Sequence, residues 1–304
     1  MERNSPPASL LTRAAALRDG LDPDVLRAAL RRHELHPLQR GVYHRGRGAP
    51  PLQRARAAVL AVAEPGAAAS HTTAARVHGL VVPKGGPEHV TLPRSERRPH
   101  RDRLRLHTAR LHPADLMEVA GVPVTAPART LVDLCRCLGR TDAVWAVERA
   151  LAAGVVTAQQ MEWAAIRLAR TPGIVMARAR FRAARSSSGS ALETEARLVI
   201  VDAGLPEPEP QVEVELPNGR HAYLDLAYPD LRIGIELDGR DHERVDALFH
   251  DRWRQNGVLS AEWILLRFTW RDVRYDTARM IETIARARDG RGQSRIPSPR
   301  RPAH

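Results

Sequence analysis

The pattern of apolar and polar positions changes at residues 186–190, a run of Ser and Gly. Before this run, apolar residues recur mostly at helical spacing. After it, short apolar or alternating segments are typical of strands. Small polar residues do not build a core, so we place a domain boundary at 185/186. The pattern thus predicts two folded regions on either side of it.

The first 48 residues predict a small DNA-binding unit. Residues 9–18 and 24–32 are expected to form two helices, because Asp22 is a good N-cap and Pro23 suits the first helical position. A short extended stretch follows at 38–43. Helix, tight turn, Arg-bearing helix and a small β element are the parts of a winged helix-turn-helix. An ordinary small helical unit would show the same pattern, and this alternative stays open.

Residues 49–185 are expected to be a mainly α (α+β) region. The pattern predicts helices at 52–83, 126–138, 142–153, 157–170 and 172–184, and strands at 88–92 and 103–108. Six arginines lie in or beside the segment between the two strands, at positions 94, 97, 98, 101, 103 and 105. This segment is interpreted either as a loop that contacts phosphate or as a solvated β-hairpin tip.

Residues 186–288 predict an α/β domain in the order α-β-β-β-α-β-α. The expected elements are a helix at 191–203, strands at 211–216, 221–227 and 231–237, a helix at 242–259, a strand at 263–268 and a helix at 271–288. Residues 289–304 are rich in Gly, Ser, Pro and Arg, a composition that does not form a core. We therefore expect a disordered basic tail.

The charge is strongly positive and unevenly placed. The net charge is +12 and the isoelectric point about 11.0. Residues 1–185 hold 30 basic and 15 acidic residues, whereas residues 186–285 hold 11 and 19. A strongly basic protein is usually one that binds a polyanion. DNA is therefore the expected partner, chiefly of the N-terminal region.

The cysteines and histidines add little to the predicted chemistry. The two cysteines, Cys135 and Cys137, are too few for a disulfide scaffold, and the first residues lack the apolar core of a signal peptide. No run of 18 apolar residues occurs, so a cytoplasmic protein is expected. The 13 histidines show no zinc spacing, and core or surface positions are expected for them.

Two carboxylates on neighbouring predicted strands form the candidate catalytic site. Asp225 and Glu236 flank the turn at 228–230, and reflection about Pro229 places Asp225 opposite position 233. A twist or bulge is then needed for both to reach one ion. Mg²⁺ (or Mn²⁺) is the expected cofactor, because hard cations prefer carboxylate oxygens and can activate a bound water. Acids at strand ends are also often simply solvated.

Two further residues are candidates for the same site. Glu193, on the helix that opens the domain, would add a third carboxylate through water. His242 would serve as a general base or orient the water. For each of them, an ordinary structural position is an open alternative.

The ordered motifs of this region resemble the Vsr-like branch of the PD-(D/E)XK nuclease superfamily, which includes very-short-patch-repair endonucleases. The motifs are residues 190–193, 223–225, 235–239 with His242, 251–256 and 265–270. The resemblance implies a restriction-endonuclease-like fold with a mixed central sheet, dependence on Mg²⁺ and cleavage of DNA. One departure is that Asp238 stands where the motif has lysine; the only lysine is Lys84. Arg252 and Arg254 are then expected to contact phosphate or stabilise charge, and His242 to assist the water.

The N-terminal region resembles the AbiEi-type antitoxins of type IV toxin–antitoxin systems. The motifs are residues 39–43, 70–75 with 78–80, 89–93 and 122–134, within about 10–140. This resemblance implies a winged helix that binds the protein's own promoter, and a cognate toxin. The candidate DNA-binding residues are Arg27, Arg31, Arg32, Arg40, Tyr43 and, in the nuclease-like domain, Arg252.

Three hypotheses follow. In the first, the protein is a Mg²⁺-dependent DNA endonuclease in defence or repair. In the second, it is an AbiEi-like antitoxin or transcriptional regulator whose nuclease-like domain is inactive, as the missing lysine suggests. In the third, the nuclease-like domain is a partner-binding platform without a role on DNA.

Overall fold

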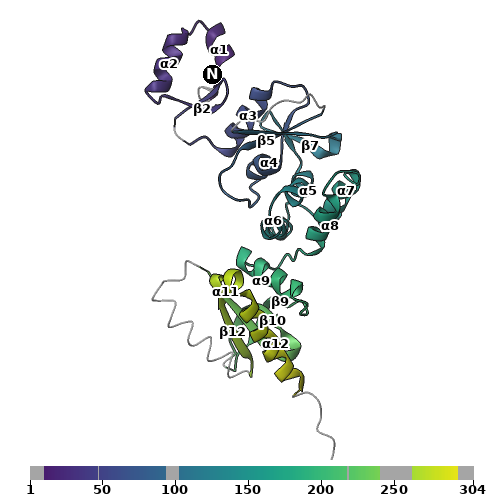
Figure 1. The fold of residues 1–304 in the computed structure, drawn as a ribbon. Coiled ribbons are helices and arrows are strands. Elements are labelled where there is room, and N and C mark those ends of the chain that lie inside the picture. Colours follow the sequence, from purple (N-terminus) through teal and green to yellow (C-terminus); the bar gives the residue numbers. More distant parts are fainter. Residues whose placement is uncertain (1–9, 47, 94–102, 218, 240–261, 294–304) are drawn as a thin grey trace, which may run out of the picture. The chain divides into compact units, whose positions relative to one another are not determined.

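The computed structural model describes residues 10–46, 48–93, 103–217, 219–239 and 262–293 (Figure 1). The chain divides into two compact units, Met1–Arg182 and Ala183–His304. This division lies close to the boundary predicted at 185/186. Both units combine helices with sheets, so the protein is a multidomain chain of mixed α/β structure.

The first unit begins with a small sheet and two helices. These are β1 (Leu10–Thr12), α1 (Arg13–Arg18), α2 (Pro23–Arg31), β2 (Leu35–Gln39) and β3 (Val42–Arg45), and the antiparallel sheet has the order β1-β3-β2. The predicted helix at 9–18 was therefore wrong at its start. Residues 10–12 pair with β3, and the helix begins after Thr12, whose hydroxyl accepts a hydrogen bond from the Ala15 N–H at 3.1 Å. Asp22 caps α2 as predicted.

A five-stranded sheet forms the centre of the first unit. Its strands are β4 (Ala68–Ala69), β5 (Glu88–Leu92), β6 (Leu104–Thr108), β7 (Leu116–Val119) and β8 (Val122–Thr125), in the order β6-β5-β4-β8-β7. Helices α3 (Pro51–Val62) and α4 (His71–Val77) pack against it. The helical region predicted at 52–83 is interrupted by β4, since Ala63 adopts a left-handed conformation and ends α3, and α4 begins after Ser70, one of the two caps predicted for its segment.

The pairing of β5 with β6 corrects one interpretation. These strands run parallel, so the segment between them is a crossover and not a hairpin tip. Four of its arginines, at positions 94, 97, 98 and 101, lie outside the described residues. Strands β7 and β8, and the short 3₁₀ helix η1 (Pro113–Asp115) before them, were not predicted.

Four helices complete the first unit. They are α5 (Pro127–Cys137), α6 (Arg140–Ala152), α7 (Ala158–Arg167) and α8 (Ile174–Arg182), close to the predicted spans. Helix α5 lies in their midst and packs against α4, α6, α7 and α8. Both cysteines are free thiols; Cys135 is buried, while Cys137 is exposed.

The second unit is built on a four-stranded mixed sheet. Its elements are α9 (Ala191–Asp202), β9 (Glu209–Glu215), β10 (His221–Tyr228), the 3₁₀ helix η2 (Pro229–Leu231), β11 (Ile233–Asp238), β12 (Ile264–Thr269), α11 (Trp270–Tyr275) and α12 (Thr277–Gln293). The strand order is β12-β11-β10-β9; β9, β10 and β11 are antiparallel, and β12 runs parallel to β11. Residues from α9, α11, α12 and the sheet share one core, with Ile200, Ile235 and Ile284 at its centre.

The C-terminal end differs from its prediction. The helix predicted at 271–288 is two helices, and α12 continues to Gln293, so residues 289–293 do not belong to a disordered tail. Contacts hold this extra turn, because the Arg291 guanidinium donates to the Glu262 carbonyl at 2.6 Å. The predicted helix 242–259 and residues 294–304 lie outside the described residues. In the described part, no helix has the length and apolar character needed to cross a membrane.

Candidate functional site

The carboxylates of the second unit come from adjacent antiparallel strands. In the register of β10 and β11, Leu226 is opposite Ile235, and the next step places Asp225 opposite Glu236. The predicted offset was therefore wrong. The turn is longer than expected, because η2 is followed by Arg232 in a left-handed conformation. Asp225 and Glu236 are therefore the next residues beyond the Leu226–Ile235 pair on these two strands.

Protein groups already contact both carboxylates. The Leu237 backbone N–H donates to Asp225 Oδ2 at 2.8 Å. The Arg267 guanidinium, on the neighbouring strand β12, lies 2.7 Å from Glu236 Oε2. Glu236 is only 4% exposed. A Mg²⁺ ion at this position would have to share the Glu236 carboxylate with Arg267 or displace it.

Glu193 is linked by a hydrogen bond to Gln211 on β9, the strand that pairs with β10. Its carboxylate, buried at the start of α9, accepts hydrogen bonds from the Gly189 N–H at 2.7 Å and from Gln211 Nε2 at 2.8 Å. The register of β9 with β10, interrupted at this one step, places Gln211 opposite Asp225. The row Glu193, Gln211, Asp225 and Glu236 offers oxygen donors, which are the ligand type that Mg²⁺ prefers.

Three other predicted residues of this site cannot be placed. His242, Arg252 and Arg254 lie outside the described residues. Asp238, at the position where the nuclease motif has lysine, ends β11 and is exposed. Asp225 and Glu236 therefore lie on neighbouring strands. The other residues that a catalytic site would need here stay a prediction.

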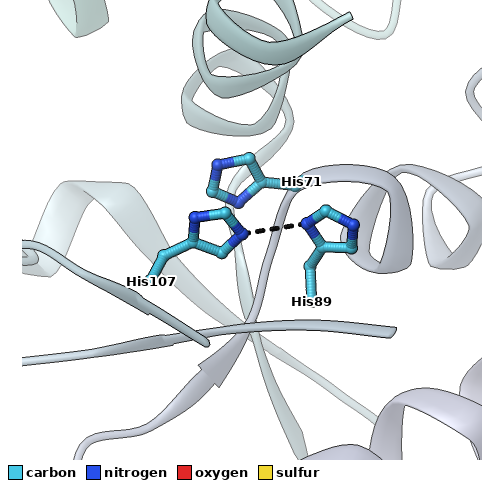
Figure 2. A group of neighbouring side chains, drawn as sticks. All are labelled: His71, His89 and His107. Atoms are coloured by element: carbon cyan, nitrogen blue, oxygen red, sulfur yellow. Dashed lines mark hydrogen bonds between the residues drawn. The ribbon is translucent and has the colours of Figure 1, made fainter. Parts of the chain in front are cut away.

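A second cluster, in the first unit, was not predicted. His71, His89 and His107 each offer a ring nitrogen, and these nitrogens lie within 4.8 Å of one another; in the described part of the chain this is the one group of three such ligand residues. His89 Nδ1 lies 2.9 Å from His107 Nε2, as the dashed line in Figure 2 shows. The His71 ring stacks on the His107 ring with 3.7 Å between centroids. We call these three residues the histidine cluster.

The histidine cluster is formed by elements that are distant in sequence. His71 is the first residue of α4, His89 lies on β5 and His107 on β6. The parallel register pairs Thr91 with His107, which brings His107 near the face of β5 that carries His89. No local spacing reveals this arrangement, which explains why the sequence showed no zinc spacing among the histidines.

Burial keeps two members of the histidine cluster, His71 and His89, in the neutral form. His71 and His89 are 4% and 6% exposed. Burial, reinforced by the neighbouring histidines, lowers the pKa of His71 well below its usual value. Burial is also the main reason that the pKa of His89 falls to about 4, with help from the charge of Arg105. Both imidazoles are therefore neutral near pH 7, which is the form that binds metal ions.

A small cavity opens beside His71 and His107. Its volume is about 100 Å³. Its lining includes Arg129, Asp133 and Arg136, which belong to a network of buried ion pairs on α5. Burial raises the pKa of Asp133, although the Arg129 and Arg136 guanidiniums act in the opposite direction. The cavity is thus lined both by imidazole rings and by the charged side chains of α5.

The predicted DNA-binding residues lie on the N-terminal part of the first unit. Arg31 and Arg40 are exposed, on α2 and in the β2–β3 turn. Arg27 and Arg32 are also exposed, but Arg27 pairs with Asp24 and Arg32 with Glu34. These exposed pairs are weak and leave both guanidiniums able to exchange partners.

Tyr43, the predicted DNA-binding aromatic residue, lies on β3. It is half-buried and packs against the small core that contains Leu26, Ala29 and Leu35. The ring therefore stabilises the sheet of β1, β2 and β3, and only part of it is accessible to a ligand.

A known protein family matches the central part of the first unit. Residues 67–181 match the AbiEi antitoxin C-terminal domain. The matched segment begins just before β4 and ends within α8, so that it contains the five-stranded sheet, α5 to α7 and the histidine cluster. The predicted AbiEi resemblance is thus confirmed for residues 67–181, whereas the Vsr-like resemblance of the second unit stays a prediction.

The chain is similar to two proteins of Mycobacterium tuberculosis. Two proteins from different strains, named uncharacterized protein MT2308 and uncharacterized protein Rv2248, are each 31% identical over 177 residues, which is 58% of this chain. The chain spans 65% of the length of these relatives. The crystal structure of the RV2827C protein from Mycobacterium tuberculosis aligns with 59% of this chain and 78% of its own, at 17% identity and a TM-score of 0.38, which is too low to show a shared fold.

Proposed function

We propose that this protein is an AbiEi-like antitoxin that acts as a DNA-binding transcriptional regulator. The observation that carries the proposal is the match of residues 67–181 to the AbiEi antitoxin C-terminal domain, in one compact unit with an N-terminal helix pair and sheet. A cognate toxin is the protein partner that this family match suggests.

The N-terminal elements support a winged helix-turn-helix. Their order β1-α1-α2-β2-β3 places two helices before a hairpin, and β1 pairs with the returning strand β3. In such units the second helix enters the major groove, with its N-terminal residues nearest the base edges. Helix α2 would take this role, because Leu26 and Ala29 face the core while Arg27 and Arg31 face solvent.

The charge distribution supports DNA as the ligand. Residues 1–185 hold twice as many basic as acidic residues, 30 against 15. Arginines on α2 and in the β2–β3 turn would contact phosphates on either side of the groove. Such contacts release counterions, and DNA affinity then falls steeply as salt rises.

The test is DNA binding to the region upstream of the protein's own gene, measured by fluorescence anisotropy across a salt series. The Arg31→Ala/Arg40→Ala variant is expected to reduce the slope of log K against log salt by about 2, one for each lost phosphate contact. The control is Arg170→Ala/Arg279→Ala. It removes two exposed arginines, one from the segment after α7 and one from α12. Equal slopes in the two variants would refute the DNA-binding surface, and salt-insensitive behaviour without DNA affinity would favour the partner-platform hypothesis.

The position of Asp225 opposite Glu236 favours a second candidate, a Mg²⁺-dependent DNA endonuclease in the second unit. Asp225 and Glu236 would hold the ion, which would activate a water for attack on the phosphodiester. Glu193 would add a third carboxylate through water, His242 would assist the attacking water, and Arg252 and Arg254 would contact phosphate.

Nicking of a supercoiled plasmid in Mg²⁺ or Mn²⁺ tests this candidate. The nuclease hypothesis expects nicking that is abolished in Asp225→Asn/Glu236→Gln and retained in Asp230→Asn, a carboxylate variant in η2. DNA binding without nicking by the wild type would leave the antitoxin and regulator hypothesis as the better account.

A further inference from the structure

We propose that His71, His89 and His107 form a binding site for one divalent transition-metal ion of the zinc class. The site lies inside the AbiEi-like segment and is independent of both the DNA-binding surface and the carboxylates of the second unit. Three imidazoles from separate elements converge there, within 4.8 Å of one another. Figure 2 shows the rings gathered between the start of α4 and strands β5 and β6.

The spacing of His89 and His107 suits a shared ion. In a tetrahedral zinc site, with Zn–N bonds of 2.0–2.1 Å, two ligand nitrogens are about 3.3 Å apart. His89 Nδ1 and His107 Nε2 are 2.9 Å apart. A small separation of these two rings would place the ion where their shared hydrogen now lies. Both rings would then carry their proton on the opposite nitrogen, so neither has to become charged.

His71 has one nitrogen engaged and one available. Its Nδ1 lies 3.0 Å from Ser70 Oγ, and Ser70 Oγ in turn accepts a hydrogen bond from Thr91 Oγ1 at 2.8 Å. A metal-binding imidazole typically donates its second N–H to such a partner, which orients the ring and selects the tautomer. His71 would therefore bind the ion through Nε2, while Ser70 and Thr91 position it.

The backbone at His71 is strained, which is a second observation at the same place. Its φ is +49°, a left-handed conformation that costs a non-glycine residue on the order of 1–3 kcal/mol and that occurs often at functional sites. The strain places the His71 ring over the His107 ring, with 16° between their planes. Stacked rings cannot direct both lone pairs at one ion, so His71 has to turn about its side-chain torsions when the ion binds.

The adjacent cavity supplies the fourth coordination position. Its volume of about 100 Å³ is ample for a metal-bound water. The chemistry of the ligands selects the metal, because imidazole suits zinc, copper, nickel and iron, whereas Mg²⁺ prefers oxygen. A set of three histidines with one open position is a recognised zinc arrangement.

The experiment uses the full-length, tag-free protein, stripped of metal and titrated with Zn²⁺ and Co²⁺. We expect one ion per chain in calorimetry, and the intense visible absorption of four-coordinate Co²⁺. His107→Ala and His89→Ala should each weaken binding at least about 100-fold, since the loss of outer partners alone costs 10–100-fold. His221→Ala, which removes an exposed histidine of the second unit, should bind as the wild type does.

The outcomes separate this site from the proposed functions. The Asp225→Asn/Glu236→Gln variant should retain the Zn²⁺ affinity, and DNA binding through α2 can fail while the metal site persists. His107→Ala, at a half-buried position, is checked for folding by circular dichroism before its titration. A wild type that takes up neither Zn²⁺ nor Co²⁺, or folded His107→Ala and His89→Ala variants with unchanged affinity, would overturn the proposal.

Discussion

Each unit gathers side chains that could bind a metal ion: the carboxylates in the second unit and the histidine cluster in the first. The two groups differ in their charge and in their partners. Asp225 and Glu236 are anions, and the protein supplies an N–H and a guanidinium to them. His71 and His89 have lowered pKa values and lie in ring contact with His107. In the folded protein, a buried carboxylate needs a partner whether or not a metal ion is bound. A neutral imidazole can remain buried without a metal ion. The comparison suggests that the histidines are the better prepared metal ligands.

The largest effect on stability is expected from the buried ion pairs of the first unit. Arg129 is 1% exposed and pairs with Asp115 and Asp133, both buried. Arg129→Leu should lower the free energy of unfolding by about 3–5 kcal/mol, because two buried carboxylates each lose one of their guanidinium partners. Arg32→Leu, which breaks only the exposed pair with Glu34, should leave it nearly unchanged. Urea denaturation measures both; equal effects would contradict the assigned role of burial.

Zinc should stabilise the first unit to a lesser degree. At a free Zn²⁺ concentration 100 times the Kd, an ion that binds only the folded state adds about 2.7 kcal/mol to the free energy of unfolding. His89→Ala should lose this gain. The measurement is thermal unfolding with Zn²⁺ or with chelator, and an equal zinc-dependent shift in the wild type and in His89→Ala would show that the ion binds elsewhere.

A smaller effect is expected at the carboxylates. Arg267→Met removes one partner of the buried Glu236 and should cost about 1–3 kcal/mol. If Asp225 and Glu236 can hold Mg²⁺, millimolar Mg²⁺ should restore part of this loss. Unfolding of Arg267→Met with and without Mg²⁺ decides the point, with Arg267→Met/Glu236→Gln as the control that should not respond. No Mg²⁺ effect in either variant would favour an inactive nuclease-like domain.

The smallest effect concerns pH in the metal-free protein. The pKa of His89 is about 4 in the folded chain, against a usual 6.5, because burial and the charges of Arg105 and Arg76 outweigh Glu88. The unfolded chain therefore binds a proton more readily than the folded chain. The contribution of neutral His89 to the free energy of unfolding is complete above pH 6.5 and is lost as pH falls toward 4. The pKa of His71 shifts in the same direction.

The pH effect is measured as the free energy of unfolding at pH 7, 6 and 5. Wild type should lose stability across this range, and His89→Gln, which cannot be protonated there, should lose less. Parallel curves for the two proteins would show that another group controls the acid sensitivity.

The apolar pattern of the chain was enough to predict most helices of the first unit and the strands predicted at 211–216, 221–227 and 231–237 in the second. Periodicity depends on local burial, which the chain records directly. Both candidate carboxylates were found because Glu236 interrupts an apolar strand and is costly to bury. Local signals failed at β1, β4, β7 and β8, since such short strands are defined by their partners.

Only the tertiary structure decided the relations between distant segments. The length of the turn at η2 set Asp225 opposite Glu236, and the parallel pairing of β5 with β6 brought His107 to His89 and His71. Hydrogen-bond register and strand direction are properties of two segments together, and neither segment carries them in its own composition. For this reason the carboxylates were foreseen with the wrong offset, and the histidine cluster was not foreseen.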